Sequence, residues 1–363
     1  MKRIFIAATK QNDGKTTVAL GLIFNFKKAF KRIGFIKPVG QRYLEEGGFK
    51  VDEDSVLIED SLKLWGIKCK LKDMSPVAVG KGFTEDYITG PFRKTITQQI
   101  KDSFKRVSLK RNLVIIEGTG HAGVGSVFDH SNAVVAKLLG SKVILISSGG
   151  IGRPIDEIIL NKALFDKEGV KLLGVIINKV MPGKFNKINE LVRKGLQRKG
   201  IEVLGVIPYN PMLSFPTVRQ ILEETGYKTL FNCSDASLDN YVAKIVIGAM
   251  QTKEAVKYIV HHSLVITPGD REDIIKLTLD LHSQGCKIAG IILTGDLMPS
   301  EEFANQTQSA SIPVLLAKSD TYTTASAVHD LTVKIRPTDK EKIETVKNLI
   351  HDYVDLDMLV KRM

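Results

Sequence analysis

Short β-branched apolar runs alternate with stretches of helical periodicity along most of the chain, and this alternation restricts the fold more than any other feature. In the first part of the chain, such runs predict strands at Arg3–Ala7, Gly34–Pro38, Leu113–Ile116, Lys142–Ile146, Leu172–Ile177 and Val203–Ile207. The helical stretches between them are Thr16–Phe30, Asp54–Trp65, Thr95–Ser108, Asn132–Leu139, Pro154–Lys167 and Lys187–Lys199. Uninterrupted apolar runs such as LVII and VILI are typical of parallel strands buried on both faces. The sequence therefore predicts an α/β protein, in which helices cover both faces of a parallel sheet.

The second part of the chain differs from the first in charge. Residues 1–200 contain 36 Lys and Arg against 19 Asp and Glu, whereas residues 201–363 contain 16 against 21. Three prolines in IPYNPMLSFPTVRQ mark an extended passage between the two parts. We therefore expect a first domain at residues 1–208, a smaller α/β domain at 209–335 and a C-terminal helical segment at 336–363.

The smaller domain repeats the alternation of strands and helices. Its apolar runs predict strands at Leu264–Ile266, Ile288–Leu293 and Val314–Leu316. Helices are expected from near Pro216 and at Asp270–His282, Ser300–Thr307 and Tyr322–Asp330, and a last helix at Lys340–Val360. Three polar turns, TPGDRED, LTGDLMPS and KSDTYTTA, follow the three strands and contain residues suited to capping the next helix, such as Asp270 and Ser300. If the strands are parallel and adjacent, the turns share one rim, where Arg271 and Thr294 are candidates for ligand contact.

Composition excludes several classes of protein. No apolar run approaches the roughly 18 residues of a membrane-spanning helix. Polar residues interrupt the apolar N-terminal segment, which argues against an export signal: Lys10, Asn12, Asp13 and Lys15. The three thiols are few and far apart, so they predict neither a disulfide framework nor a metal site: Cys69, Cys233 and Cys286. The basic first half has no basic run interleaved with aromatic residues and no zinc finger. We therefore expect a cytoplasmic protein that binds neither membrane nor nucleic acid.

The strongest local signal is RIFIAATKQNDGKTTVALGL, which reads as strand, polar loop, Gly-Lys-Thr-Thr and helix. A loop at a helix N-terminus directs its N–H groups toward anionic oxygens, and the helix dipole favours negative charge there. Gly14 permits close approach of the backbone, Lys15 reaches the β- and γ-phosphates, and the Thr16 hydroxyl can bind Mg²⁺. Together with the neighbouring Asn12, Asp13 and Thr17, these residues predict a site for ATP and Mg²⁺.

The loop departs from the pattern G-x-x-x-x-G-K-[ST] at its first position, where Thr9 replaces glycine. It resembles the deviant form K-G-G-x-G-K-T, with Lys10 at the position of the signature lysine and with Gln11 and Asn12 in place of two glycines. That resemblance implies a homodimer, in which Lys10 of one subunit reaches the phosphates bound by the other. The alternative is that Lys10 is a solvated loop lysine.

The chain also resembles a named family over nearly its whole length. AATKQNDGKTT, FIKPVGQ, VDEDSVLI, VIIEGTGHAG and VIINKV occur in the order seen in dethiobiotin synthetase, a relative of cobyrinic acid a,c-diamide synthase. They look still more like the P-loop module at the front of long-form phosphate acetyltransferases. Residues 210–335 resemble the DRTGG domain found beside that module, without the literal DRTGG string. The resemblance stops at Met363, so we expect the chain to lack the acetyltransferase domain of that family.

The resemblance implies roles for further residues. Glu117, at the end of LVII, would hold Mg²⁺ together with Thr16 and an acidic residue of VDEDS, for which Asp54 is preferred and Asp52 is the alternative. Lys37 matches the lysine of the KPV motif of dethiobiotin synthetase, where an ammonium stabilises phosphoryl or carboxylate charge. The alternatives are an ordinary lysine before a turn and, for Asp52 and Asp54, a solvated helix N-terminus.

Base preference is predicted from VIINKVMP. Asn178 begins a sequence like NKxD, but Met181 stands where the guanine-binding Asp would be. An Asn amide can pair with adenine, whereas the carboxylate that would bind guanine is missing from this sequence. We therefore expect ATP rather than GTP.

Three functions fit these observations. The first is a regulatory ATPase that couples its nucleotide state to a DRTGG sensor domain, with a link to acetyl-phosphate metabolism implied by the resemblance. The second is an ATP-dependent ligase that activates a carboxylate or carbamate. Amidation like that of cobyrinic acid a,c-diamide synthase is disfavoured, because Cys286 precedes a strand and does not lie at a strand-to-helix turn. The third is a nucleotide-binding scaffold without turnover.

Overall fold

The computed structural model divides into two compact units, and it describes residues 1–46, 48–63, 69–90, 93–230, 234–309, 312–331 and 333–363. Unit 1 comprises Met1–Tyr209 together with Ile335–Met363, and unit 2 comprises Asn210–Lys334. The C-terminal segment thus returns to the first unit. The end of the helix expected at Asp54–Trp65, and Cys233, lie outside the described residues.

Unit 1 contains a parallel six-stranded sheet in the order β10-β9-β8-β1-β7-β2. Its strands are β1 (Lys2–Ala8), β2 (Ile33–Ile36), β7 (Leu113–Glu117), β8 (Lys142–Ser148), β9 (Leu172–Val180) and β10 (Val203–Pro208). All six strands were expected, and their central residues are buried on both faces as the apolar runs predicted.

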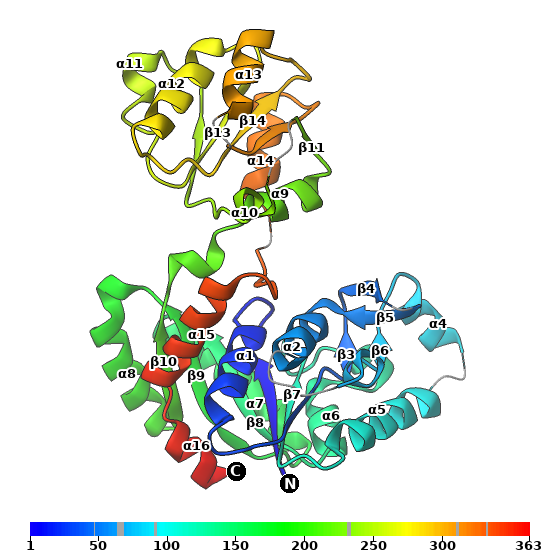
Figure 1. Cartoon of the computed structure of the whole chain (residues 1–363). Coiled ribbons are helices and arrows are strands. Elements are labelled where there is room, and N and C mark those ends of the chain that lie inside the picture. Colours follow the sequence, from blue (N-terminus) through cyan, green and yellow to red (C-terminus); the bar gives the residue numbers. More distant parts are fainter. Residues whose placement is uncertain (47, 64–68, 91–92, 231–233, 310–311, 332) are drawn as a thin grey trace. The chain divides into compact units, whose positions relative to one another are not determined.

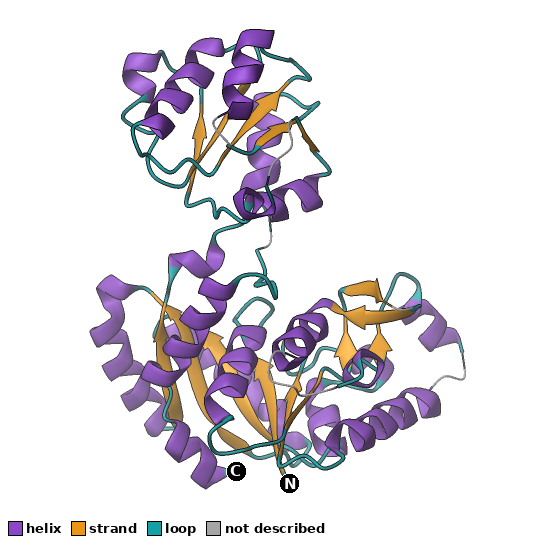
Figure 2. Ribbon diagram, in the orientation of Figure 1, coloured by secondary structure: helices purple, strands orange, loops and turns teal. Residues whose placement is uncertain are grey.

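Helices cover both faces of this sheet (Figures 1 and 2). One core cluster joins Phe5 and Val143 of the sheet to α5 (Arg93–Ser108), α6 (Asn132–Leu138), α7 (Gly152–Lys167) and α8 (Phe185–Gln197). Four further helices belong to this unit: α1 (Lys15–Phe26), α2 (Glu53–Lys63), α15 (Lys340–Tyr353) and α16 (Leu356–Arg362). The predicted α/β architecture is confirmed.

The segment between β2 and β7 contains small elements that the apolar pattern did not predict. β3 (Val39–Gly40) pairs with β6 (Val77–Ala78), and β4 (Tyr43–Glu46) forms an antiparallel hairpin with β5 (Phe49–Asp52). Short helices complete unit 1: α3 (Leu71–Met74), α4 (Phe83–Thr89), η1 (Ser126–Phe128) and η2 (Pro182–Lys184). The hairpin leads directly into α2, so it fixes where the acidic start of that helix lies.

The single C-terminal helix expected at Lys340–Val360 is wrong, because the chain breaks between α15 and α16. Val354 forms an isolated antiparallel bridge with Gly205 of β10, and the Asp355 amide donates to the Leu204 carbonyl over 2.8 Å. The Asp355 carboxylate then caps α16 by accepting from the Met358 amide. Tertiary pairing with β10 thus overrides the helical periodicity.

Unit 2 contains a five-stranded sheet in the order β11-β15-β14-β13-β12, parallel except for β11. The strands are β11 (Lys228–Thr229), β12 (Lys244–Ile247), β13 (Ser263–Pro268), β14 (Gly290–Thr294) and β15 (Val314–Leu316). Its helices are η3 (Pro211–Ser214), α9 (Val218–Thr225), α10 (Asp235–Leu238), α11 (Thr252–Ala255), α12 (Glu272–Ser283), α13 (Glu301–Ser309) and α14 (Thr321–His329). The three expected strands are present as β13, β14 and β15, and they meet the condition stated for a shared rim, since they are adjacent and parallel. β11 and the edge strand β12 were not expected.

Helix capping in unit 2 differs in one place from the prediction. Asp270 does not cap α12: the N-cap is Arg271, and no side chain caps that end. The cap that the turn sequences predicted occurs instead at Asp320, whose carboxylate accepts from the amides of Tyr322 and Thr323. In the described part of both units, no helix is long and apolar enough to cross a bilayer.

Candidate functional site

The loop at residues 9–14 joins the carboxyl end of β1 to the N-terminus of α1. Asn12 and Gly14 both adopt left-handed backbone conformations, with φ of 64° and 100°. Gly14 is the N-cap of α1 and no side chain caps this end, so the first N–H groups of the helix are left for another acceptor. A helix N-terminus of this kind favours an anion. Lys15, Thr16 and Thr17 form the first turn of α1, as the sequence predicted.

Two residues at the end of β9 form hydrogen bonds with the backbone of the loop. The Asn178 Nδ2 donates to the Asp13 carbonyl over 2.8 Å, and the Lys179 Nζ donates to the Asn12 carbonyl over 2.7 Å. A Cβ on Gly14 would overlap the Asn178 amide, so only glycine fits there. Asn178 is therefore in contact with the phosphate loop, and its pairing with adenine stays a prediction. Sequence reasoning did not identify the supporting role of Lys179.

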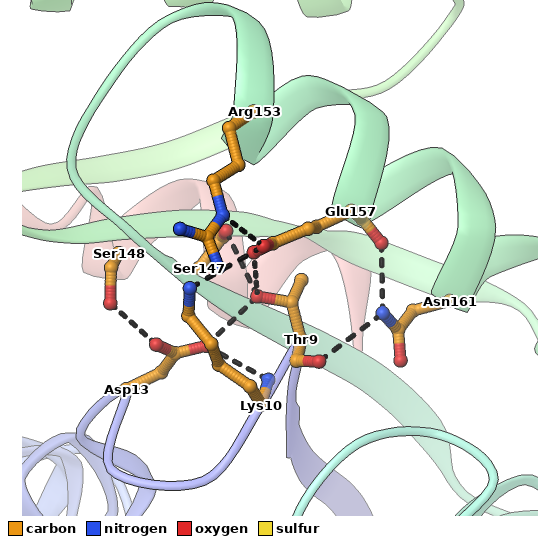
Figure 3. Close-up of polar contacts among 8 residues, drawn as sticks. All are labelled: Thr9, Lys10, Asp13, Ser147, Ser148, Arg153, Glu157 and Asn161. Carbon is orange, nitrogen blue, oxygen red and sulfur yellow. Dashed lines mark hydrogen bonds and ion pairs between the residues drawn. The ribbon is translucent and has the colours of Figure 1, made fainter.

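A polar network lies behind the loop and joins it to β8 and α7 (Figure 3). The Asp13 carboxylate is buried and accepts from the Lys10 amide over 3.0 Å and from the Ser148 hydroxyl. The Thr9 hydroxyl lies 2.8 Å from Asp13 Oδ2 and 3.0 Å from the Ser147 hydroxyl. Asp13 was predicted to contact the nucleotide, and in this structure its side chain shapes the loop.

Lys10 forms an ion pair within its own chain. Its Nζ lies 3.4 Å from Glu157 Oε1 on α7, and its side chain is 40% exposed. Arg153 Nε donates to the same oxygen over 2.7 Å (Figure 3). Burial raises the pKa of Glu157, but the hydrogen bonds from Arg153 and Lys10 outweigh it and hold that pKa below its ordinary value. Glu157 thus stays ionised and competes for Lys10.

Lys37 lies at the centre of a buried cluster of three carboxylates. Its Nζ lies 2.8 Å from Asp52 Oδ1 and 3.6 Å from Glu117 Oε1, and it also donates to Asp54 Oδ2. Burial alone would lower the pKa of Lys37, but Asp54, Glu117 and Asp52 together raise it well above its ordinary value. A Cβ on Gly40 would overlap the Asp52 carboxylate, so β3 approaches the cluster through a glycine. The structure therefore brings together the four ionisable groups that the sequence placed at this edge.

Glu117 connects this cluster to the phosphate loop. Its Oε1 accepts from the Thr16 hydroxyl over 2.8 Å, and burial raises its pKa to about 7. Burial also lowers the pKa of Lys15, against the opposite effect of the Glu117 carboxylate. Lys15 and Glu117 therefore share one desolvated site.

The donor set fits a phosphate-bound Mg²⁺. Glu117 Oε2 is buried and has no hydrogen-bond partner, although a buried carboxylate oxygen needs one. In the described residues no group of three His, Cys, Asp or Glu side chains is arranged to hold a metal. Mg²⁺ does not require such a group, since it binds through one or two carboxylates, phosphate oxygens and waters. Thr16 and Glu117 would hold it, with Asp54 or Asp52 as a further ligand.

The two candidates in unit 2 are bound within the protein. The Arg271 guanidinium forms two hydrogen bonds with the Asp273 carboxylate and donates to the carbonyls of Gly248 and Met250. Thr294 is 1% exposed, and its hydroxyl lies 2.8 Å from that of Thr321. Both residues fix the turns that follow the parallel strands.

Comparison with known proteins finds relatives that match the whole chain. The chain is 27% identical to the phosphate acetyltransferase of Pseudomonas putida over 379 residues, and 27% identical to that of Nitratidesulfovibrio vulgaris over 375 residues. The alignments cover 100% and 99% of this chain, and 52% and 51% of those relatives. The chain thus spans about half the length of the curated relatives it matches.

Similar solved structures cover one part of the chain each. MinD of Pyrococcus horikoshii, complexed with Mg-ADP, is 17% identical, covers 58% of this chain and 83% of its own, and has a TM-score of 0.36. The CBS and DRTGG domains of Clostridium perfringens pyrophosphatase, complexed with diadenosine tetraphosphate, are 22% identical. They cover 38% of this chain and 60% of their own, with a TM-score of 0.28.

Models of two families match successive parts of the chain. The model of an AAA domain family matches residues 2–217, which include the phosphate loop and the Lys37 cluster. The model of the DRTGG domain matches residues 223–331. The chain therefore belongs to this AAA domain family of P-loop proteins, here combined with a DRTGG domain.

Proposed function

We propose that this protein is a regulatory ATPase that binds ATP and Mg²⁺ and couples its nucleotide state to the DRTGG domain. The observation that carries the proposal is the packing of α1 against α15. α1 begins at the phosphate loop, and α15 is the first long helix after unit 2 in the sequence. A displacement of either helix therefore acts on the other.

The two helices are in close contact, through apolar packing and through a hydrogen bond. A Cβ on Gly21 would overlap Ile350, so the glycine allows the helices to approach. The Asn25 Nδ2 donates to the Lys347 carbonyl over 2.9 Å, and the end of α15 is bound to β10 through Val354. Because packed helices shift as units, nucleotide-dependent movement of α1 would reach the segment that leads out of unit 2.

The site residues have distinct roles in the proposed nucleotide complex. The first N–H groups of α1 and Lys15 bind the phosphates, and Thr16 and Glu117 orient the metal. Mg²⁺ supplies neutralisation of phosphate charge when bound. Lys37, at the centre of the carboxylate cluster, provides a second ammonium close to Lys15, where it offsets negative charge that develops during phosphoryl transfer. ATP is the preferred triphosphate, since Met181 replaces the carboxylate that guanine requires.

The assembly and context follow from the same proposal. Lys10 would leave Glu157 and contact phosphates across a homodimer, as the deviant loop implies. A cytoplasmic role near acetyl-phosphate metabolism rests on the phosphate acetyltransferases to which the chain is similar.

Calorimetry and turnover assays of the full chain test the proposed function. We expect binding of ATP with Mg²⁺ and slow basal hydrolysis, both lost in Lys15→Ala and retained in the surface variant Lys162→Ala. Turnover that requires an added carboxylic acid would favour the ligase. Binding without turnover would favour a scaffold, and absence of binding would refute the proposal.

Hydrogen exchange tests the coupling separately. ATP should change the exchange of amides in α15 and in residues 210–334, and Asn25→Ala should reduce the change in residues 210–334 while ATP still binds. The variant Asn186→Ala, at an exposed position of α8, serves as the matched control. Equal exchange with and without ATP in the wild type would contradict the coupling.

A further inference from the structure

A second hollow lies at the opposite end of β1 from the phosphate loop. It has a volume of about 540 Å³ and is shallow and widely open to solvent. Residues at the amino end of β1, along α5 and at the end of α6 line it. Because β1 has seven residues at about 3.3 Å each, roughly 20 Å separates this hollow from the phosphate loop. The two sites are therefore distinct, and the proposed binding of ATP and Mg²⁺ does not involve the second.

The floor of the hollow is apolar and well packed. Phe104 and Leu139 are buried, with 8% and 2% of their surfaces exposed, and Leu138 lies beside them. Leu109 lies at the mouth and is 70% exposed. Met1, which is 52% exposed, also lines the hollow, so together with Leu109 it offers apolar surface to a ligand with an apolar body.

Four cationic side chains line the same hollow, and no carboxylate does: Arg3, Lys101, Lys105 and Lys110. In the described part of the chain, no ion pair involves Lys101, Lys105 or Lys110. Lys101 and Lys105 are four residues apart on α5, a spacing that places like charges side by side and destabilises a helix. An anion between them would relieve this repulsion.

Arg3 is held in place at this hollow. Its guanidinium lies over the Phe104 ring at 5.3 Å from the centroid, and its Nη1 donates to the Leu139 carbonyl over 2.7 Å. The arginine therefore keeps its charge at the apolar floor without needing a carboxylate. A preorganised cation of this kind costs a ligand little ordering.

We propose that this hollow binds a small amphiphilic anion, whose apolar body lies on Phe104 and Leu138 and whose phosphate or carboxylate group lies among the lysines. The volume falls in the range of small-molecule sites, which is about 300–1,000 Å³. An apolar surface with a few convergent polar groups is the usual composition of such sites.

Titration of the full chain with decyl phosphate below its micelle concentration tests the proposal. We expect saturable binding that weakens with added salt, because the lysines are exposed and their charges are screened. Lys101→Gln with Lys105→Gln should weaken it by about tenfold or more, equivalent to ~1.4 kcal/mol, and Leu109→Ser by a few-fold. The control, Lys162→Gln with Lys194→Gln, removes two surface lysines elsewhere and should change nothing. ATP binding should persist in every variant and so report an intact fold.

Two further probes identify the source of the anion. Inorganic phosphate alone should bind at least tenfold more weakly than decyl phosphate. Decanoate should compete with decyl phosphate for the hollow. Equal affinity for inorganic phosphate, or binding only to vesicles containing anionic lipid, would overturn the proposal. So would decyl phosphate binding that neither the lysine pair nor Leu109→Ser affects.

Discussion

The side-chain amide of Asn178 donates to the carbonyl of Asp13 over 2.8 Å and occupies the space beside Gly14. The residue that the NKxD-like sequence pattern assigned to the base is thus in contact with the backbone of the phosphate loop. Asn178 is 6% exposed, so the hydrogen bond is shielded from water. The relationship makes loop geometry depend on the end of β9, and it separates two roles that an experiment can distinguish.

Asn178→Ala should weaken the binding of ATP and of inorganic tripolyphosphate to a similar extent, by about tenfold. The cause is the loss of one buried hydrogen bond to the loop, worth ~1 kcal/mol, together with an unsatisfied Asp13 carbonyl. Calorimetry with both ligands provides the measurement. A variant that loses ATP affinity but keeps that for tripolyphosphate would show that Asn178 contacts the base and does not position the loop.

The sheet and the phosphate loop were predictable because local sequence determines them. The apolar runs of β1 and β7 and the Gly14-Lys15-Thr16 turn carry their signals within a few residues. The edge strand β12 was missed, since Lys244–Ile247 is short and one-sided. The break at Val354 was also missed, because it depends on pairing with Gly205, 149 positions earlier in the chain.

The interior of the site was only partly predictable for the same reason. Sequence reasoning placed Lys37 and Glu117 at one sheet edge, since both follow strands whose carboxyl ends meet there. It did not predict that the Lys37 ammonium would form ion pairs with Asp52 and Asp54. These two residues come from a hairpin and a helix, whose positions depend on the tertiary fold. The contact between Lys10 and Glu157 joins residues 147 positions apart and has no local signal.

Lys37→Met should destabilise unit 1 by about 3 kcal/mol, because three buried carboxylates would lose their shared cation. Chemical denaturation followed by the exchange of β7 amides measures the change. Lys194→Met is the matched control, since Lys194 and its partner Glu190 are both exposed on α8, where such pairs contribute ~1 kcal/mol or less. Adding Asp54→Asn to Lys37→Met should restore part of the stability. Equal effects of the Lys37 and Lys194 variants would contradict the buried cluster.

The stability of the nucleotide-free protein should fall as pH rises from 5 to 8. Burial raises the pKa of Glu117 to about 7, above its unfolded value, so the native state binds the proton more tightly. The stabilisation is complete below the unfolded pKa and is lost as pH rises through 7, on the order of 3 kcal/mol in total. Glu117→Gln should flatten this dependence.

Denaturation of unit 1 at pH 5 and pH 8 checks this expectation. Glu190→Gln removes an exposed carboxylate from α8 and should leave the difference between the two pH values unchanged. If Glu117→Gln retains the full fall of the wild type, another group is responsible and Glu117 is ionised throughout.

Release of Lys10 from Glu157 should control assembly. In the proposed dimer Lys10 must reach phosphates on the partner, whereas here its ammonium lies 3.4 Å from Glu157 Oε1. Glu157→Gln removes the competing charge, so light scattering with ATP and Mg²⁺ should show dimers at lower protein concentration than the wild type requires.

Lys10→Ala should abolish ATP-dependent dimers, and Lys10→Ala with Glu157→Gln should behave like Lys10→Ala alone. The pair is partly exposed and contributes ~1 kcal/mol or less, so the shift with Glu157→Gln should not exceed about fivefold. Dimers that form equally in Lys10→Ala would show that this lysine is an ordinary loop residue.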